Sequence, residues 1–220
     1  MNVNHHPDDA TLLSYAAGSL IESFEILVAC HLQFCERCRA RVSEAEQLGA
    51  ALLQEATPEP LSASRDAFFA RLSAEPLIHP TVKDEDDNQA SFNRRSPLPK
   101  ALQLLLGEQA DALVWRRLVP GIQQIRLATS DGGLRLLKIS PGMSMPLHSH
   151  KGSELTLIMQ GSYSDELGRF QRGDVADLDT DVEHQPITDG NTPCICLVAT
   201  DASLVFRGLL PKLLQPFTGF

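Results

Sequence analysis

The hydrophobic pattern of this chain changes period near its middle, and this change restricts the fold more than any other feature. Up to about residue 75 the apolar residues recur every three to four positions, as on one face of an α-helix. Beyond residue 98 they fall in short runs separated by turn residues, which is typical of β-strands. The stretch between them, "HPTVKDEDDNQASFNRRSPLP", is polar and bounded by proline, as linkers are. We therefore predict a multidomain chain, all-α and then all-β, with a helical bundle at residues 1–78, a flexible linker at 79–97 and an antiparallel β domain, a sandwich or a barrel, at 98–220.

The individual runs predict where the main elements lie. Helical runs cover "DDATLLSYAAG", which stops at Gly18, a segment from Ser19 through His31, "CRARVSEAEQLGAALLQEA" and "SASRDAFFARLSAE". Strand-like runs are "QQIRLATS", "LRLLKIS", "ELTLIMQGSYS", "GRFQRGDVADL", "PCICLVAT" and "SLVFRGLL". Many short strands at regular spacing indicate a sandwich or a barrel.

Charge and composition narrow the class of partner. The 220 residues are 43% hydrophobic and carry a formal net charge of −9. This charge argues against direct binding to nucleic acid, which requires a basic face, and favours a basic protein partner or a small molecule. The first residues, "MNVNHHPDDATLL", do not look like a secretory signal, and no apolar run is long enough to span a membrane. We expect a cytoplasmic protein with no membrane association.

The stretch "HLQFCERC" places His31, Cys35 and Cys38 at the spacing H-x3-C-x2-C. On a helix, His31 and Cys35 project from the same face one turn apart. One imidazole and two thiols suit zinc, which takes four ligands at a structural site. The fourth ligand is either His5 or His6, and we prefer His6 because Pro7 then starts the first helix directly after it.

The alternative for these cysteines is a helix with small buried thiols. Cys38 stands between Arg37 and Arg39, which is a poor context for a core position. Burial of the thiols also does not explain why His31 stands four residues before Cys35. We therefore favour a metal site over a helix with buried thiols. Cys30 points about 100° away from His31 on a helix and is predicted to be a small buried residue.

The β half carries a second constellation of ligand types. "GMSMPLHSHKGSELTLIMQG" has the spacing G-x5-H-x-H-x3-E-x6-G and presents His148, His150 and Glu154. The two histidines alternate along a strand and so share one face. His184 follows eleven residues after Gly173 in "GDVADLDTDVEH". Three imidazoles and one carboxylate predict a divalent metal site, with zinc as the first choice, although these ligands also suit Fe, Mn, Ni or Cu.

Both halves resemble known families. "HHPDDATLLSYAAGSLIESFEILVACHLQFCERCRA" is similar to the zinc-binding anti-sigma domain of regulators of extracytoplasmic-function sigma factors, and this likeness implies zinc ligands at His6, His31, Cys35 and Cys38. The second constellation resembles the cupins, which form a double-stranded β-helix, although the second cupin motif reads "FQRGD" without its usual proline. The order of the two halves resembles the ChrR-type anti-sigma factors. The resemblance implies an inhibitor of an extracytoplasmic-function sigma factor that is released in response to singlet oxygen or related oxidants sensed through the cupin.

Several functional assignments stay open at this stage. Phe68, Phe69 and Leu72 either fill a groove on the sigma factor or pack against the third helix. Cys194 and Cys196 share a strand face and are candidate sensors, but small buried filler is the better prediction for them. Dimerisation through the cupin is a further possibility.

Two other functions compete with the regulator. The cupin half could be a metal-dependent enzyme, similar to a dioxygenase, with the helices as a regulatory appendage. It could instead bind a small ligand through its metal. We expect a regulator rather than an enzyme, and no catalytic residue is predicted.

Overall fold

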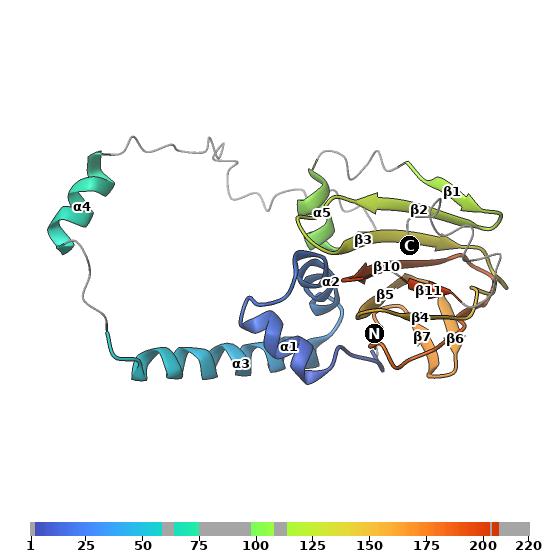
Figure 1. The fold of residues 1–220 in the computed structure, drawn as a ribbon, viewed down its shortest axis with the longest axis horizontal. Coiled ribbons are helices and arrows are strands. Elements are labelled where there is room, and N and C mark those ends of the chain that lie inside the picture. Colours follow the sequence, from blue (N-terminus) through green and yellow to red (C-terminus); the bar gives the residue numbers. More distant parts are fainter. Residues whose placement is uncertain (1–2, 59–63, 75–97, 108–113, 203, 207–220) are drawn as a thin grey trace. The chain divides into compact units, whose positions relative to one another are not determined.

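The computed structural model describes residues 3–58, 64–74, 98–107, 114–202 and 204–206 (Figure 1). The chain divides into two compact units, one formed by residues 1–49 with 98–220 and the other by residues 50–97. The linker predicted at 79–97 lies outside the described residues. The predicted fold class, helices followed by an antiparallel cupin-like barrel, is confirmed.

The described helices are α1 (Asp9–Ala16), α2 (Glu22–Leu32), α3 (Glu36–Glu55), α4 (Arg65–Ala74) and α5 (Lys100–Leu106). α1 begins after Asp8, whose carboxylate accepts a hydrogen bond of 2.6 Å from the Thr11 backbone N–H. It ends before Gly18, which has a φ of 63° that side chains with a Cβ rarely adopt. The residues around α1 therefore encode both ends of this helix locally.

α2 begins at Glu22 rather than at Ser19, because the barrel supplies its cap. Ile21, at the N-cap position, offers no side-chain hydrogen bond. Instead the Glu22 backbone N–H donates to Asp131 Oδ1 over 2.6 Å, and the Ser130 N–H donates to the Glu22 carboxylate. Ser130 and Asp131 belong to the turn between two strands of the barrel, about 110 residues away, so no local pattern around Glu22 marks this start.

The barrel is built from strands that form three sheets. They are β1 (Arg116–Val119), β2 (Ile122–Leu127), β3 (Gly133–Ile139), β4 (His148–His150), β5 (Glu154–Gln160), β6 (Ser162–Asp165), β7 (Gly168–Gln171), β8 (Val175–Leu178), β9 (Ile187–Asp189), β10 (Cys194–Thr200) and β11 (Leu204–Phe206). The large sheet has the order β1-β2-β3-β10-β5-β8, a smaller one has the order β7-β6-β9, and β11 pairs with β4. All described pairings are antiparallel.

The large sheet is covered on both faces, which explains the long apolar runs in β3, β5 and β10. In β5, Leu155 and Leu157 face the helices, whereas the alternate residue Ile158 faces the interior of the barrel. On the helical side, Leu27 and Val28 of α2 are fully buried in one apolar cluster with these leucines and with Leu102 of α5. α2 thus packs on the large sheet, with α5 beside it, as a further layer (Figure 1).

The other unit contains α4, and none of its described side chains is buried. Phe68 is 53% exposed and Phe69 51% exposed. These rings are thus exposed within their own unit, and both predicted alternatives for them stay predictions. Within the described helices, none is both long and apolar enough to cross a membrane.

Candidate metal centres

Four segments bring the first predicted ligand set together. His6 lies in the extended segment before α1, His31 in the last turn of α2, Cys35 just before α3 and Cys38 in its first turn. One potential ligand atom from each of these residues lies within 4.8 Å of all the others. His31, Cys35 and Cys38 are buried, and His6 is partly exposed.

The distances inside this cluster suit a tetrahedral ion. His31 Nε2 lies 3.2 Å from Cys38 Sγ, and His6 Nδ1 lies 3.3 Å from Cys35 Sγ and 3.4 Å from Cys38 Sγ. Around a zinc ion with bonds of about 2.0–2.3 Å, ligand atoms are separated by about 3.3–3.8 Å. The Cys38 backbone N–H also donates to Cys35 Sγ over 3.4 Å, which helps to hold this sulfur in the cluster. The donor set and its spacing therefore fit zinc.

The two adjacent histidines of the N-terminus have different surroundings. His6 faces the cysteines, whereas His5 Nδ1 lies 3.3 Å from Asp174 Oδ2 on the barrel. His31 is oriented by the barrel as well, because its Nδ1 lies 2.9 Å from the carbonyl oxygen of Gly173. A carbonyl can only accept, so Nδ1 carries the proton and Nε2 presents its lone pair to the cluster.

Burial sets the protonation of the metal-free cluster. It lowers the pKa of His31 to about 4, so the imidazole is neutral at physiological pH and can bind a metal. It also raises the pKa of Cys38 to about 12, with the neighbouring Cys35 adding to the effect. An incoming metal must therefore displace a proton from the Cys38 thiol.

The second cluster lies inside the barrel. His148 of β4, Glu154 of β5 and His184, which pairs with His148 through an isolated bridge, are all buried, with ligand atoms within 4.8 Å of one another. His148 Nε2 and His184 Nε2 face each other over 3.1 Å. The backbone of His150 belongs to β4, but its side chain lies outside what the structure describes.

Both imidazoles of the barrel cluster are fixed through their other ring nitrogen. His184 Nδ1 lies 2.9 Å from the Asp165 carboxylate, and His148 Nδ1 lies 2.8 Å from the carbonyl oxygen of Pro146. Each Nδ1 therefore donates, and each Nε2 lone pair points at a shared position. Burial lowers the pKa of His148 to about 4, with the neighbouring His184 adding to the effect, and burial raises the pKa of Glu154. This set fits a divalent metal but does not select one.

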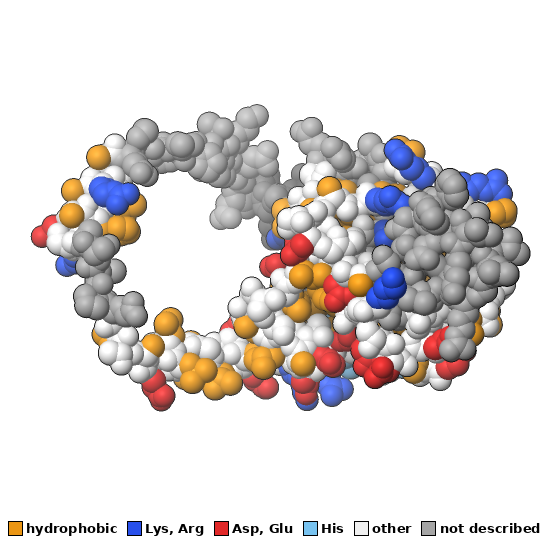
Figure 2. Space-filling model, viewed as in Figure 1, with side chains coloured by type: hydrophobic (Ala, Val, Ile, Leu, Met, Phe, Trp, Pro, Cys, Tyr) orange, Lys and Arg blue, Asp and Glu red, His pale blue; other side chains and the backbone are white. Residues whose placement is uncertain are grey.

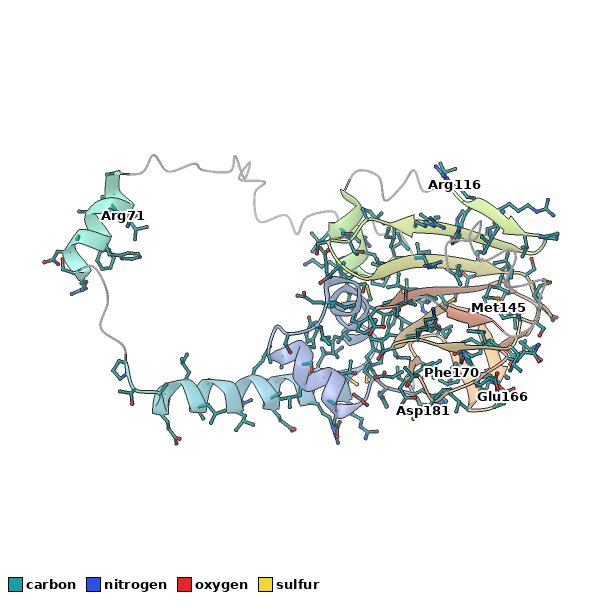
Figure 3. The ribbon with its side chains drawn as sticks, viewed as in Figure 1. Arg71, Arg116, Met145, Glu166, Phe170 and Asp181 are labelled. Carbon is teal, nitrogen blue, oxygen red and sulfur yellow. The ribbon has the colours of Figure 1, made fainter. Side chains whose placement is uncertain are left out.

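The barrel cluster opens onto a small cavity of about 40 Å³. Its wall includes Met145, Tyr163 and Cys196 besides the three cluster residues, and Met145 is labelled in Figure 3. Such a space holds a water or a molecule of similar size, since pockets for organic ligands typically enclose about 300–1,000 Å³. Cys194 and Cys196 are both buried.

Replacing Asp165 with Asn is expected to weaken metal binding in the barrel by about 10- to 100-fold, because the amide no longer stabilises the orientation and basicity of the His184 ring as a carboxylate does. The measurement is the metal content of the purified chain after dialysis against a graded chelator. Asp189→Asn is the matched control, since Asp189 bonds Arg169, Ser162 and Ser164 and not a ligand. Equal metal retention in the two variants would contradict the assignment.

Sequence reasoning did not find the residues that orient the ligands. Asp165 lies 19 residues before His184, and Asp174 lies 169 residues after His5. Neither aspartate belongs to the predicted ligand spacings. The sequence offered no local signal for either aspartate, because each contacts a residue far away along the chain.

Comparison with known proteins identifies the family of this chain. A family model described as the ChrR Cupin-like domain matches residues 106–203. The Anti-sigma-E factor ChrR of Cereibacter sphaeroides is 39% identical over 219 residues, which covers 99% of each chain. A chain from the crystal structure of Rhodobacter sphaeroides SigE in complex with the anti-sigma ChrR superposes with a TM-score of 0.73 at 36% identity, covering 91% of this chain and 100% of that one. With this identity over nearly its whole length, the chain belongs to the ChrR family of anti-sigma factors.

Proposed function

We propose that this chain is a cytoplasmic anti-sigma factor that binds and inhibits an extracytoplasmic-function sigma factor. The observation that carries the proposal is the 39% identity to the Anti-sigma-E factor ChrR across both halves of the chain. The four-residue cluster at His6, His31, Cys35 and Cys38 supports a structural zinc ion in the helical part. Such an ion supplies folding free energy by tying the N-terminus to α2 and α3.

A groove between α1 and α3 is a candidate surface for the partner. It encloses about 310 Å³ and is lined by Asp9, Leu12, Leu13, Arg41, Glu44, Ala45 and Leu48. Leu13 is 53% exposed and Leu48 57% exposed, so the groove presents apolar side chains to solvent. Apolar side chains line α3 in the space-filling view (Figure 2). An amphipathic helix of a sigma factor is the kind of element that binds such a groove.

In the other unit, α4 presents a second apolar surface. Phe68, Phe69 and Leu72 are each about half exposed, and the two rings pack edge to face at 5.8 Å. We infer that α4 is also a partner-binding element. The net charge of −9 favours the approach to a basic, nucleic-acid-binding surface.

We propose that the barrel at residues 98–220 senses the signal, singlet oxygen or a related oxidant, while the helical part at residues 1–78 binds the sigma factor. The small cavity supports a sensing role over the enzymatic one, because about 40 Å³ next to the barrel cluster leaves little room for an organic substrate. The metal would act there as a Lewis acid toward a small ligand.

Replacing Leu48 with Asp is expected to lower the affinity for the sigma factor by at least about 10-fold, since it puts a charge into an apolar contact. Isothermal titration calorimetry with the full chain measures the effect. Leu104→Asp is the control, because Leu104 is 66% exposed on α5 and lies outside the groove. Equal affinity of the two variants would remove the α1–α3 groove from the interface.

The function itself is tested by co-purifying the full chain with each extracytoplasmic-function sigma factor of the same genome, with and without a zinc chelator. We expect a tight complex with one sigma factor that is lost on chelation. Binding to none of them would reject the proposal, and a complex that resists the chelator would reject the structural role of zinc.

A further inference from the structure

One turn of the barrel, Gln171–Asp174 between β7 and β8, holds the N-terminal segment that carries His6. Asp174 is fully buried, and its Oδ1 accepts hydrogen bonds from the backbone N–H groups of Asn4 at 2.7 Å and His5 at 3.2 Å. Its Oδ2 accepts from the Gln171 N–H at 3.0 Å and faces the His5 ring at 3.3 Å. In return, the carbonyl oxygen of His5 accepts from the Val175 N–H at 3.1 Å. The backbone next to His6 is therefore fixed by barrel atoms.

The same turn also holds a second member of the zinc cluster. The carbonyl oxygen of Gly173, the residue before Asp174, accepts from His31 Nδ1 over 2.9 Å. Gly173 has a φ of 94°, a conformation that strains residues with a Cβ, so the direction of this carbonyl depends on glycine. Gly173 thus orients His31 directly, and Asp174, the next residue, orients His6 through its neighbour His5.

A stack of rings leads from this turn to the barrel cavity. The His5 ring lies 4.3 Å from the ring of Phe170, and Phe170 stacks on Tyr163 at 5.0 Å (Figure 3 labels Phe170). Tyr163 lines the cavity that also contains His148, Glu154 and His184. Tyr163 and Phe170 are buried and close-packed, so the stack is a continuous line of contacts from the cavity to the partly exposed His5 ring.

We propose that the turn Gln171–Asp174 forms an outer shell of the zinc site, with Asp174 and Gly173 as positioning residues that tighten zinc binding and slow its release. This inference rests on the proposed zinc centre. It gives the barrel a route of direct contacts to the helical part, so that damage or rearrangement around the cavity loosens zinc and, with it, the partner-binding helices. Outer-shell partners of this kind typically contribute 10- to 100-fold to metal affinity.

The test uses Asp174→Asn in the full chain loaded with Co²⁺ in place of zinc. Thiolate bound to Co²⁺ gives an intense charge-transfer absorption, whereas the barrel ligands His and Glu give none, so this band reports the Cys35–Cys38 site alone. Asparagine keeps one acceptor oxygen, but its NH2 group cannot accept, so the side chain can no longer accept the hydrogen bonds of both Oδ1 and Oδ2. We expect the band to be lost to a competing chelator at about 10- to 100-fold lower chelator concentration than in the unchanged chain.

Asp189→Asn serves as the matched control, because Asp189 is a barrel carboxylate that bonds Ser162, Ser164 and Arg169 rather than the N-terminal segment. We expect the control to keep the affinity of the unchanged chain. If Asp174→Asn fails to fold, His5→Ala provides the second variant, since it removes only the ring contacts with Asp174 and Phe170 and keeps the backbone bonds. We expect it to lose the band at several-fold lower chelator concentration.

The outcomes separate this inference from the proposed function. If the foldable Asp174 or His5 variant holds Co²⁺ as tightly as Asp189→Asn does, the outer-shell role is overturned while the zinc centre stands. If the unchanged chain shows no thiolate band, the zinc centre itself is wrong and the inference fails with it. If a chelator releases the bound sigma factor faster from Asp174→Asn than from Asp189→Asn, this result would show that the turn also affects partner binding.

Discussion

Replacing Cys35 and Cys38 together with Ser is expected to abolish zinc binding in the helical part and, with it, binding of the sigma factor. Both sulfur atoms lie within 3.4 Å of His6 Nδ1, so the double variant removes half of the proposed ligand set. Structural zinc sites in small domains contribute about 10–16 kcal/mol of binding free energy, and this free energy is partly folding free energy. We expect zinc affinity to fall by more than about 1,000-fold, because a neutral hydroxyl is a far weaker zinc ligand than a thiolate. The measurements are bound zinc per chain and co-purification with the sigma factor.

The control for this variant is Cys30→Ala. Cys30 lies in α2 one residue before His31, is fully buried and is not a member of the cluster. Its loss removes a thiol from the same helix and leaves the ligands in place. We expect Cys30→Ala to keep its zinc and its partner. A Cys35–Cys38 double variant that still bound the sigma factor tightly would show that zinc is not required for inhibition.

Replacing Leu27 with Ala is expected to destabilise the helical layer and the barrel together, by about 3 kcal/mol in the free energy of unfolding. Leu27 is fully buried in the apolar cluster that joins α2 to Leu155, Leu157 and Leu197 of the large sheet. The cost combines lost apolar burial with the cavity that remains. Urea unfolding, followed by circular dichroism of the strands and by the intrinsic fluorescence of Trp115, measures the change.

A surface leucine provides the comparison for this prediction. Leu104→Ala on α5 changes a side chain that is 66% exposed, and we expect its unfolding free energy to stay within about 0.5 kcal/mol of the unchanged chain. If Leu27→Ala lowered the unfolding free energy no more than Leu104→Ala does, α2 would not share an apolar core with the large sheet. Two separate unfolding transitions in the unchanged chain would likewise show that the helical layer and the barrel do not share one core.

Much of the fold and of the candidate site was predictable from the sequence. The alternation of His148 and His150 along a strand predicted that the two side chains share one face, because strand residues two apart share a side. The spacings to Glu154 and from Gly173 to His184 predicted the other two ligands through the resemblance to the cupins. The spacing of His31, Cys35 and Cys38 predicted a second ligand set for the same kind of reason, since a helix turns once in about 3.6 residues. The structure gathers the ligand atoms of His148, Glu154 and His184, and of His31, Cys35 and Cys38 with His6.

Other features depended on segments far apart in the chain. The start of α2 is set by Asp131, the orientation of His184 by Asp165 and that of His31 by Gly173, which is 142 residues away. A hydrogen bond between such distant segments leaves no periodicity and no local spacing in a single sequence. Its donor and acceptor are ordinary residue types until the chain has folded.

The amino-acid sequence by itself determined the order of helices and strands and the residue types that can bind metal, because both follow from local geometry and ligand chemistry. Only the tertiary structure decided that His6 faces the cysteines while His5 faces Asp174. It also decided that the turn Gln171–Asp174 contacts His31 directly and His6 only through its neighbour His5. The physical reason is that these contacts arise from the packing of the helical layer on the large sheet, which depends on the whole buried surface rather than on any one segment.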